Sequence, residues 1–153
     1  MNVKHLTPFI DALVKVLRDH GIDSLKRGKL LKKEDMNVDL DITSVVGING
    51  GIKGNIAYSL SLETCRNLLV SMGLVNSSNL AGSEILKAVG VFTELIINEA
   101  ARIFLDGGIL ITSAPPTIVS GNEMLFIISP VQTITINIET PYGTIETNIG
   151  LEE

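Results

Sequence analysis

Residues Ser83–Phe104, SEILKAVGVFTELIINEAARIF, are the stretch that does most to decide the fold. Apolar side chains recur in it every three or four residues, the spacing that places them on one face of an α-helix. We expect Ser83 to cap this helix, because a serine side chain accepts hydrogen bonds from the first turn. The predicted buried face consists of Ile85, Ala88, Val89, Phe92, Ile96, Ala100 and Ile103.

The segments after this helix have a period of two, which is typical of strands. Residues 133–138, TITINI, alternate polar and apolar side chains. Pro141-Tyr142-Gly143 predicts a hairpin turn, and Ser120-Gly121 a second turn. The strands are expected over residues 109–112, 123–128, 131–139 and 144–149.

A strand, its hairpin partner and a helix are expected before the long helix. The strand runs from Asn37 to Ile48 and turns at Asn49-Gly50-Gly51 into its partner over residues 52–60. Ser61 then has the character of an N-cap for a short helix.

The first helix is expected to begin at Thr7-Pro8 and to end at Gly21. Thr is a good cap, Pro fits the first helical position, and Gly is the usual C-terminal stop. The resulting order of elements predicts an α+β fold, with helices packed on one face of a largely antiparallel β-sheet. Since the edges of such a sheet need cover, we expect a homodimer.

The chain has 153 residues, which fits one domain over residues 1–153. No apolar run approaches the roughly 18 residues that would span a bilayer, and the N-terminus lacks the features of a signal peptide. Cys65 is the single cysteine, so it cannot form an internal disulfide, and we expect it to be a small core residue. These features predict a soluble, cytoplasmic protein without a membrane partner.

Positive charge is concentrated near the N-terminus, although the net charge is −5. Residues 103–153 contain no Lys or Arg. Five of the twelve basic residues are Lys26, Arg27, Lys29, Lys32 and Lys33. No aromatic residue is interleaved with them, which disfavours nucleic acid as a partner. A solvated loop is the first interpretation, and a docking patch for an acidic partner is the second.

The order and spacing of these segments resemble the CheX/CheC family of chemotaxis phosphatases. The resemblance includes GINGGIKGNIAYSLSLET at residues 47–64, the long helix, and APPTIVSG at residues 114–121. It implies a CheX-like fold and dephosphorylation of a CheY-like response regulator. It also implies that any Mg²⁺ belongs to the regulator, so no cofactor and no metal are expected in this chain.

The family carries its chemistry on the long helix, in a motif of Asp or Ser, then Glu four residues later, then Asn three residues later. Such residues share one helix face. The Glu pairs with a lysine of the regulator, and the Asn amide positions a water in line with the phosphorus. Aligned without a gap to Pro115-Pro116, the motif positions fall on Lys87, Val91 and Glu94, and none of them matches.

Glu94 would place a negative charge where the family has an amide. At roughly 4 Å and an effective dielectric constant of about 20, its repulsion from a phosphoryl group is on the order of 4 kcal/mol. Glu94 and Asn98 are an alternative catalytic pair one turn further along. Their spacing of four rotates the amide by about 100° relative to a spacing of three. They are otherwise interpreted as polar residues on a solvent-exposed helix face.

The remaining candidates have structural interpretations. Pro115 and Pro116 are expected to fix the path of the chain after the helix. The glycine-rich residues 47–54 are followed by a strand, which favours a hairpin over a phosphate-binding loop. His5 and His20 lie far from other metal-ligating residues in the sequence.

The sequence therefore predicts a CheX-like signalling protein that binds a phosphorylated CheY-like response regulator in chemotaxis or a related two-component system. The lost motif predicts weak or no phosphatase activity. Two alternatives stay open: an active phosphatase that uses Glu94 and Asn98, and a structural dimerisation module.

Overall fold

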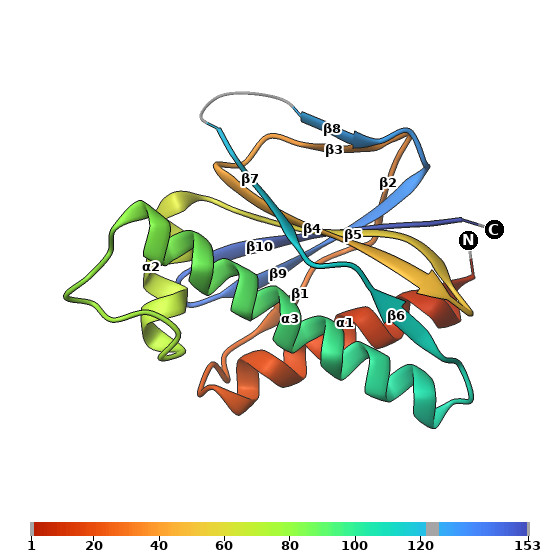
Figure 1. Ribbon diagram of the computed structural model, residues 1–153, viewed down its shortest axis with the longest axis horizontal. Helices are drawn as coiled ribbons and strands as arrows, with labels where there is room; N and C mark the ends of the chain where they lie inside the picture. The colour runs from red at the N-terminus through yellow and green to blue at the C-terminus, as the bar shows by residue number, and fades with distance from the viewer. Residues whose placement is uncertain (1, 122–125, 153) are drawn as a thin grey trace.

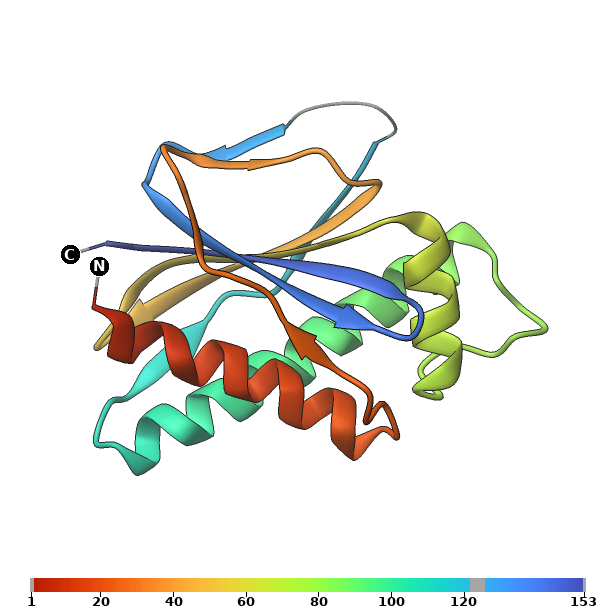
Figure 2. The same ribbon diagram turned by 180° about the vertical axis from the view of Figure 1, so that it is seen from behind.

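The computed structural model describes residues 2–121 and 126–152 and arranges them in layers about a large antiparallel sheet (Figure 1). Helices α1 (Val3–Asp19) and α3 (Gly82–Asp106) pack against each other across one face of this sheet. A two-stranded sheet lies on the other side (Figure 2). The predicted α+β fold, with helices on one face of a largely antiparallel sheet, is confirmed.

The large sheet has eight strands in the order β1-β9-β10-β5-β4-β6, with β2 beside β9 and β7 beside β4. Strands β4 (Ile42–Gly50) and β5 (Lys53–Leu60) form the first predicted hairpin. Strands β9 (Thr133–Thr140) and β10 (Gly143–Glu152) form the second. Gly143 has a φ of +130°, a conformation that favours glycine, and it closes the predicted turn. Both predicted hairpins are confirmed.

Helix α1 begins before the predicted Thr7, and its cap is Asn2, whose side chain accepts a hydrogen bond from the first turn. Pro8 lies inside the helix, where its missing N–H removes one backbone hydrogen bond. The earlier start brings Leu6 into the core, which offsets that loss. The predicted end is right: Gly21 follows the helix with a φ of +86°.

The predicted basic loop is an edge strand with a bulge. Strands β1 (Lys26–Arg27) and β2 (Leu31–Lys33) both pair with β9. Their partners on β9 are three residues apart, from Ile138 to Thr135, whereas Arg27 and Leu31 are four residues apart. The extra residue makes a bulge within residues 28–30. The loop prediction was wrong because an exposed, charged edge strand carries no alternating apolar pattern.

The strand predicted from Asn37 to Ile48 is divided in two. Strand β3 (Met36–Val38) pairs with β8 (Phe126–Ser129) in the small sheet, and the chain rejoins the large sheet only at β4. The alternating pattern continues through this break, and periodicity cannot tell which sheet a strand joins. The predicted strand at 123–128 is confirmed from Phe126 onward, while residues 123–125 lie outside the described residues.

Helix α2 (Leu62–Ser71) is capped as predicted by Ser61, whose Oγ accepts from the backbone N–H of Thr64 at 3.1 Å. Helix α3 begins one residue before Ser83, so the predicted serine cap is wrong; Ala81 stands at that position without a side-chain hydrogen bond. The predicted buried face of α3 is confirmed except at its end, where Ile103 is half-buried. The face also includes Thr93, Ile97 and Phe104.

After α3 the chain returns along β4 in two short strands, β6 (Ile111–Ser113) and β7 (Thr117–Ser120). The predicted turn at Ser120-Gly121 is wrong at Ser120, which pairs with Ile42 at the end of β7. Pro115 and Pro116 lie between the strands and have no N–H for a ladder. Strand β7 was missed because these prolines and its short length obscure the pattern.

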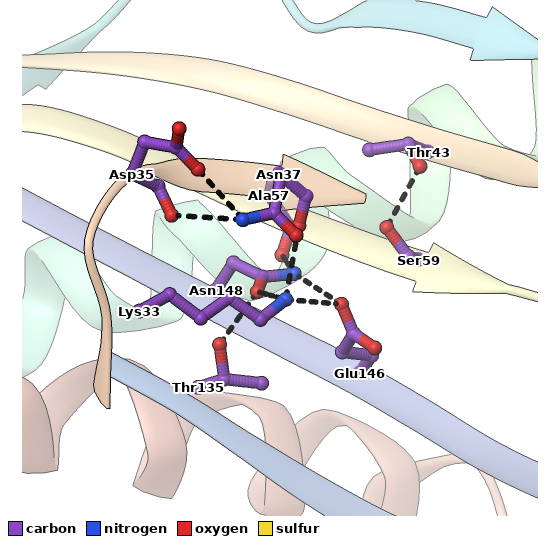
Figure 3. A network of polar contacts seen from close by, with 9 residues as sticks. All are labelled: Lys33, Asp35, Asn37, Thr43, Ala57, Ser59, Thr135, Glu146 and Asn148. Carbon is purple, nitrogen blue, oxygen red and sulfur yellow. Dashed lines mark hydrogen bonds and ion pairs between the residues drawn. The ribbon is translucent and has the colours of Figure 1, made fainter. Parts of the chain in front are cut away.

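A network of polar side chains joins β2 and β10 of the large sheet to β3 of the small sheet, on the side away from α1 and α3 (Figure 3). The ammonium group of Lys33 donates to the carbonyl oxygen of Asn37 at 2.9 Å and to Glu146 Oε1 at 3.2 Å. It also donates at 3.1 Å to the side-chain oxygen of Asn148, which is fully buried. Thr135 donates to the same oxygen at 2.7 Å. These partners allow the polar groups to be buried.

Candidate functional site

The exposed face of α3 presents Lys87, Val91, Glu94 and Asn98. Their spacings of three and four residues keep them on one side of the helix. The side chain of Lys87 is 74% exposed, and its Nζ lies 3.5 Å from Glu84 Oε1. Val91 is 47% exposed, an apolar side chain among polar neighbours. This face is therefore free of the core and accessible to a partner.

A cleft of about 340 Å³ lies between this face and the segment that joins β6 to β7. Glu94 and Asn98 line its helical side, and Pro115 and Pro116 line the opposite side. Because β6 and β7 pair with different halves of β4, the prolines are held beside the middle of α3 (Figure 1). The other lining residues are Val46, Thr93, Ile97, Ser113 and Ala114.

Hydrogen bonds fix both walls of the cleft to β4. The hydroxyl of Thr93 lies 2.6 Å from Ser44 Oγ and 2.8 Å from the carbonyl oxygen of Val89, and both hydroxyl groups are buried. On the other wall, the backbone N–H of Ala114 donates to the carbonyl oxygen of Gly47 at 3.0 Å. The backbone positions of Glu94 and the proline segment are thus set by the same strand.

No protein-family model matches the chain. The curated protein CheY-P phosphatase CheX of Thermotoga maritima is 27% identical over 125 residues, which cover 81% of this chain and 80% of that protein. A CheC-like superfamily protein from Shewanella sp. PV-4 superimposes with a TM-score of 0.85 at 26% identity, with 100% of both chains covered. The chain is CheX-like: it is similar in both sequence and fold to CheX/CheC proteins.

Two further solved structures share the fold of this CheX-like chain. CheX from Desulfovibrio desulfuricans has a TM-score of 0.82 at 24% identity, with 97% of this chain and 99% of that chain covered. The CheX–CheY–BeF3–Mg complex from Borrelia burgdorferi gives a TM-score of 0.72 at 19% identity, with 97% and 98% covered.

The CheX-like fold brings together some of the residues singled out in the sequence and separates others. Glu94 and Asn98 meet the Pro115-Pro116 segment in the cleft. Lys87 and Val91 share the helix face but are not among the residues that line the cleft. Glu94 and Asn98 are thus nearer the prolines than the aligned motif positions Lys87 and Val91 are.

Sequence reasoning missed Ile97. It stands three residues after Glu94, the interval that the family motif has between its Glu and its Asn. Ile97 is buried and lines the cleft, whereas Asn98, one residue further, is exposed. The motif's own interval, counted from Glu94, could have identified this position. An apolar side chain there cannot orient a water molecule.

Other reactive groups in the CheX-like chain have structural surroundings. Within residues 2–121 and 126–152, no group of three or more His, Cys, Asp or Glu residues is placed to hold a metal ion. His20 Nδ1 lies 2.8 Å from the carbonyl oxygen of Val16 at the end of α1. Burial raises the pKa of Cys65 to about 12, which keeps it a thiol at neutral pH. In the described part of the chain, no helix is long and apolar enough to cross a membrane.

Proposed function

We propose that the exposed face of α3 binds a phosphorylated CheY-like response regulator, and that the chain acts in chemotaxis or a related two-component system with weak or no phosphatase activity. The observation that carries this proposal is the cleft that joins Glu94 and Asn98 to Pro115 and Pro116. The CheX–CheY complex from Borrelia burgdorferi and the CheX named as a CheY-P phosphatase in Thermotoga maritima support the choice of partner.

Weak activity follows from the groups that α3 offers. Val91 has no charge with which to bind a lysine of the regulator. Glu94 only accepts hydrogen bonds when it is ionised, and it repels a nearby phosphoryl group. If Glu94 is instead taken as the motif acid, Ile97 stands at the position of the amide and gives no hydrogen bond to an attacking water. Binding can therefore persist through the exposed face while the orientation of water, on which phosphoryl transfer depends, is lost.

An active phosphatase is the second candidate, and one observation favours it. Glu94 and Asn98 line the same cleft, so an acid and an amide are both available beside the prolines. In this alternative, Glu94 contacts the regulator's lysine and Asn98 reaches over Ile97 to orient the water. The spacing of four places the amide about 100° around the helix from a spacing of three, so Asn98 must lean back into the cleft.

The two candidates are separated by mixing the protein with a phosphorylated receiver domain from the same organism. We expect a complex, detected by fluorescence anisotropy, and little change in the rate of aspartyl-phosphate decay. Accelerated decay that is lost in both Glu94→Ala and Asn98→Ala would establish the phosphatase. Absence of both a complex and accelerated decay would leave a structural dimerisation module and contradict the regulator as partner.

We also propose that the chain is a cytoplasmic homodimer without a cofactor of its own. The large sheet has an open edge at β6 and β7 in the described structure, and an open sheet edge favours pairing with another chain. Light scattering at several protein concentrations tests the dimer, and a constant monomer mass would contradict it.

A further inference from the structure

We propose that residues 26–33, called here the basic edge, dock an extended acidic segment of a partner protein that also carries apolar side chains. The basic edge comprises β1, the bulge and β2, and it lies along β9 at one end of the large sheet. The α3 cleft lies beside β6 and β7, at the other end. The proposal therefore concerns a surface separate from the site on α3.

The basic edge carries positive charge that the described part of the chain does not neutralise. Arg27 pairs with Asp11 at 3.1 Å, and Lys33 pairs with Glu146 at 3.2 Å. Lys26, Lys29 and Lys32 are exposed, and none of them forms an ion pair with an acid within the described residues. The rest of the chain is acidic. The electrostatic field of the protein therefore attracts an anionic partner at the basic edge.

Two leucines lie among these lysines. Leu30 is 49% exposed and Leu31 is 55% exposed. Lysines and a bulge on an edge strand also prevent unwanted pairing with other sheets. That role explains the charges, but it does not explain two adjacent large apolar side chains in solvent at the same edge. A partner that offers both carboxylates and apolar groups satisfies both features.

The basic edge is held in place before any partner arrives. At one end Arg27 is tied to Asp11 of α1, and at the other Lys33 donates to Glu146 and Asn148 of β10 (Figure 3). In between, the backbone N–H of Gly28 donates to β9 at 2.8 Å. A preorganised strand loses little conformational entropy on binding, which favours its use as a docking surface.

The neighbouring acids favour a narrow segment over a flat anionic surface. Glu139 is the register partner of Lys26, and Glu34 follows β2 directly; both are exposed. A lipid surface broad enough to meet the lysines would also approach these carboxylates and be repelled by them. An extended peptide can follow the edge, since a strand advances about 3.3 Å per residue and so spans the lysines within a few residues.

Fluorescence anisotropy with a labelled short peptide of Glu, Asp and Leu residues tests the proposal. The double variant Lys26→Gln/Lys32→Gln is expected to bind the peptide about fivefold more weakly than the wild type, because two exposed charge contacts are lost. The matched control Lys4→Gln/Lys53→Gln removes the same charge from exposed lysines elsewhere and is expected to bind like the wild type. The double variant Leu30→Ser/Leu31→Ser is expected to weaken binding even at high salt.

Equal weakening in the two lysine variants would show a response to net charge alone and overturn the proposal. Unchanged binding of the peptide by the leucine variant would contradict the proposed apolar contacts with the partner. Stronger binding of the wild type to phosphatidylserine vesicles than to the peptide would assign the edge to a lipid surface instead. Thermal unfolding of every variant establishes that the fold is retained, as expected for substitutions of exposed residues.

Discussion

At the scale of single residues, the chemistry of the α3 cleft depends on what stands next to Glu94. The carboxylate of Glu94 can contact a cation of a partner, but it cannot donate a hydrogen bond to a water molecule. Ile97 occupies the inner position of the cleft and Asn98 the outer one. In the proposed site, the inner residue is thus apolar, and the residue whose amide can hydrogen-bond to water stands one position further around the helix.

Replacing Ile97 by Asn places an amide three residues after Glu94. We expect Ile97→Asn to accelerate aspartyl-phosphate decay of a bound receiver above the wild-type rate, because the amide then points into the cleft. Burying a polar group in place of an apolar one is expected to cost about 3 kcal/mol of unfolding free energy. The measurement is phosphate release at a temperature where circular dichroism shows the variant folded.

Ile97→Thr is the matched control, since it introduces a polar group of similar shape without an amide. It is expected to lose comparable stability and to leave the decay rate at the wild-type level. If Ile97→Asn binds the receiver and yet gives no acceleration over Ile97→Thr, then Glu94 does not stand in the position of the motif acid.

Cys65 illustrates how burial suppresses reactivity. It is almost fully inaccessible, and burial raises its pKa to about 12. Because the thiolate is the reactive form, we expect iodoacetamide at neutral pH to modify Cys65 only when the protein unfolds. Mass spectrometry in native buffer and in urea checks this expectation. Comparable modification rates in the two solvents would show that α2 opens readily.

At the scale of elements, the sequence predicts those that bury an apolar face and misses those that do not. Helix α3 was predicted because its apolar stripe is long and regular. The sequence predicts a loop for β1 and β2 because residues 26–32 face solvent, and only pairing with β9 makes them strands. For the cleft, the helix face could be read from spacing, whereas the approach of Pro115 and Pro116 depends on the pairing of β6 and β7 with β4.

Strand β2 provides a direct test of how an exposed edge is held. Lys33 donates to Asn37, Glu146 and Asn148, so Lys33→Met removes three hydrogen bonds and the cation beside the Glu146 carboxylate. We expect a loss of about 2 kcal/mol in the free energy of unfolding, measured with urea. The adjacent Lys32 is exposed and is the matched control. Lys32→Met is expected to change the free energy of unfolding by less than about 0.5 kcal/mol. Equal losses in the two variants would show that the hydrogen bonds of Lys33 do not stabilise the fold.

At the scale of the whole molecule, charged side chains of α1 and α3 line a shared cleft between the two helices that cover the sheet. Asp11, Lys15 and Asp19 of α1 face Glu99 and Arg102 of α3 across a cleft of about 430 Å³. Arg102 contacts Glu99 at 2.6 Å and Asp106 at 3.0 Å. Each helix thus carries ion pairs of its own beside the apolar seam, and we expect these pairs to make the stability of the fold depend on pH.

The pH dependence is expected to pass through Glu99. The hydrogen bond from Arg102 lowers the pKa of the Glu99 carboxyl below its ordinary value of 4.5. A carboxyl whose pKa is lower in the folded state stabilises the fold above its unfolded pKa, and this contribution is lost as the pH falls through the folded pKa. Glu99→Gln is therefore expected to be less stable than the wild type at about pH 7 and to approach it at about pH 3. Urea unfolding at both pH values measures the difference.

Glu152→Gln, at the exposed end of β10, is the control and is expected to follow the wild type at both pH values. A stability gap between Glu99→Gln and the wild type that stays constant with pH would show that the side chain acts through packing rather than through its charge.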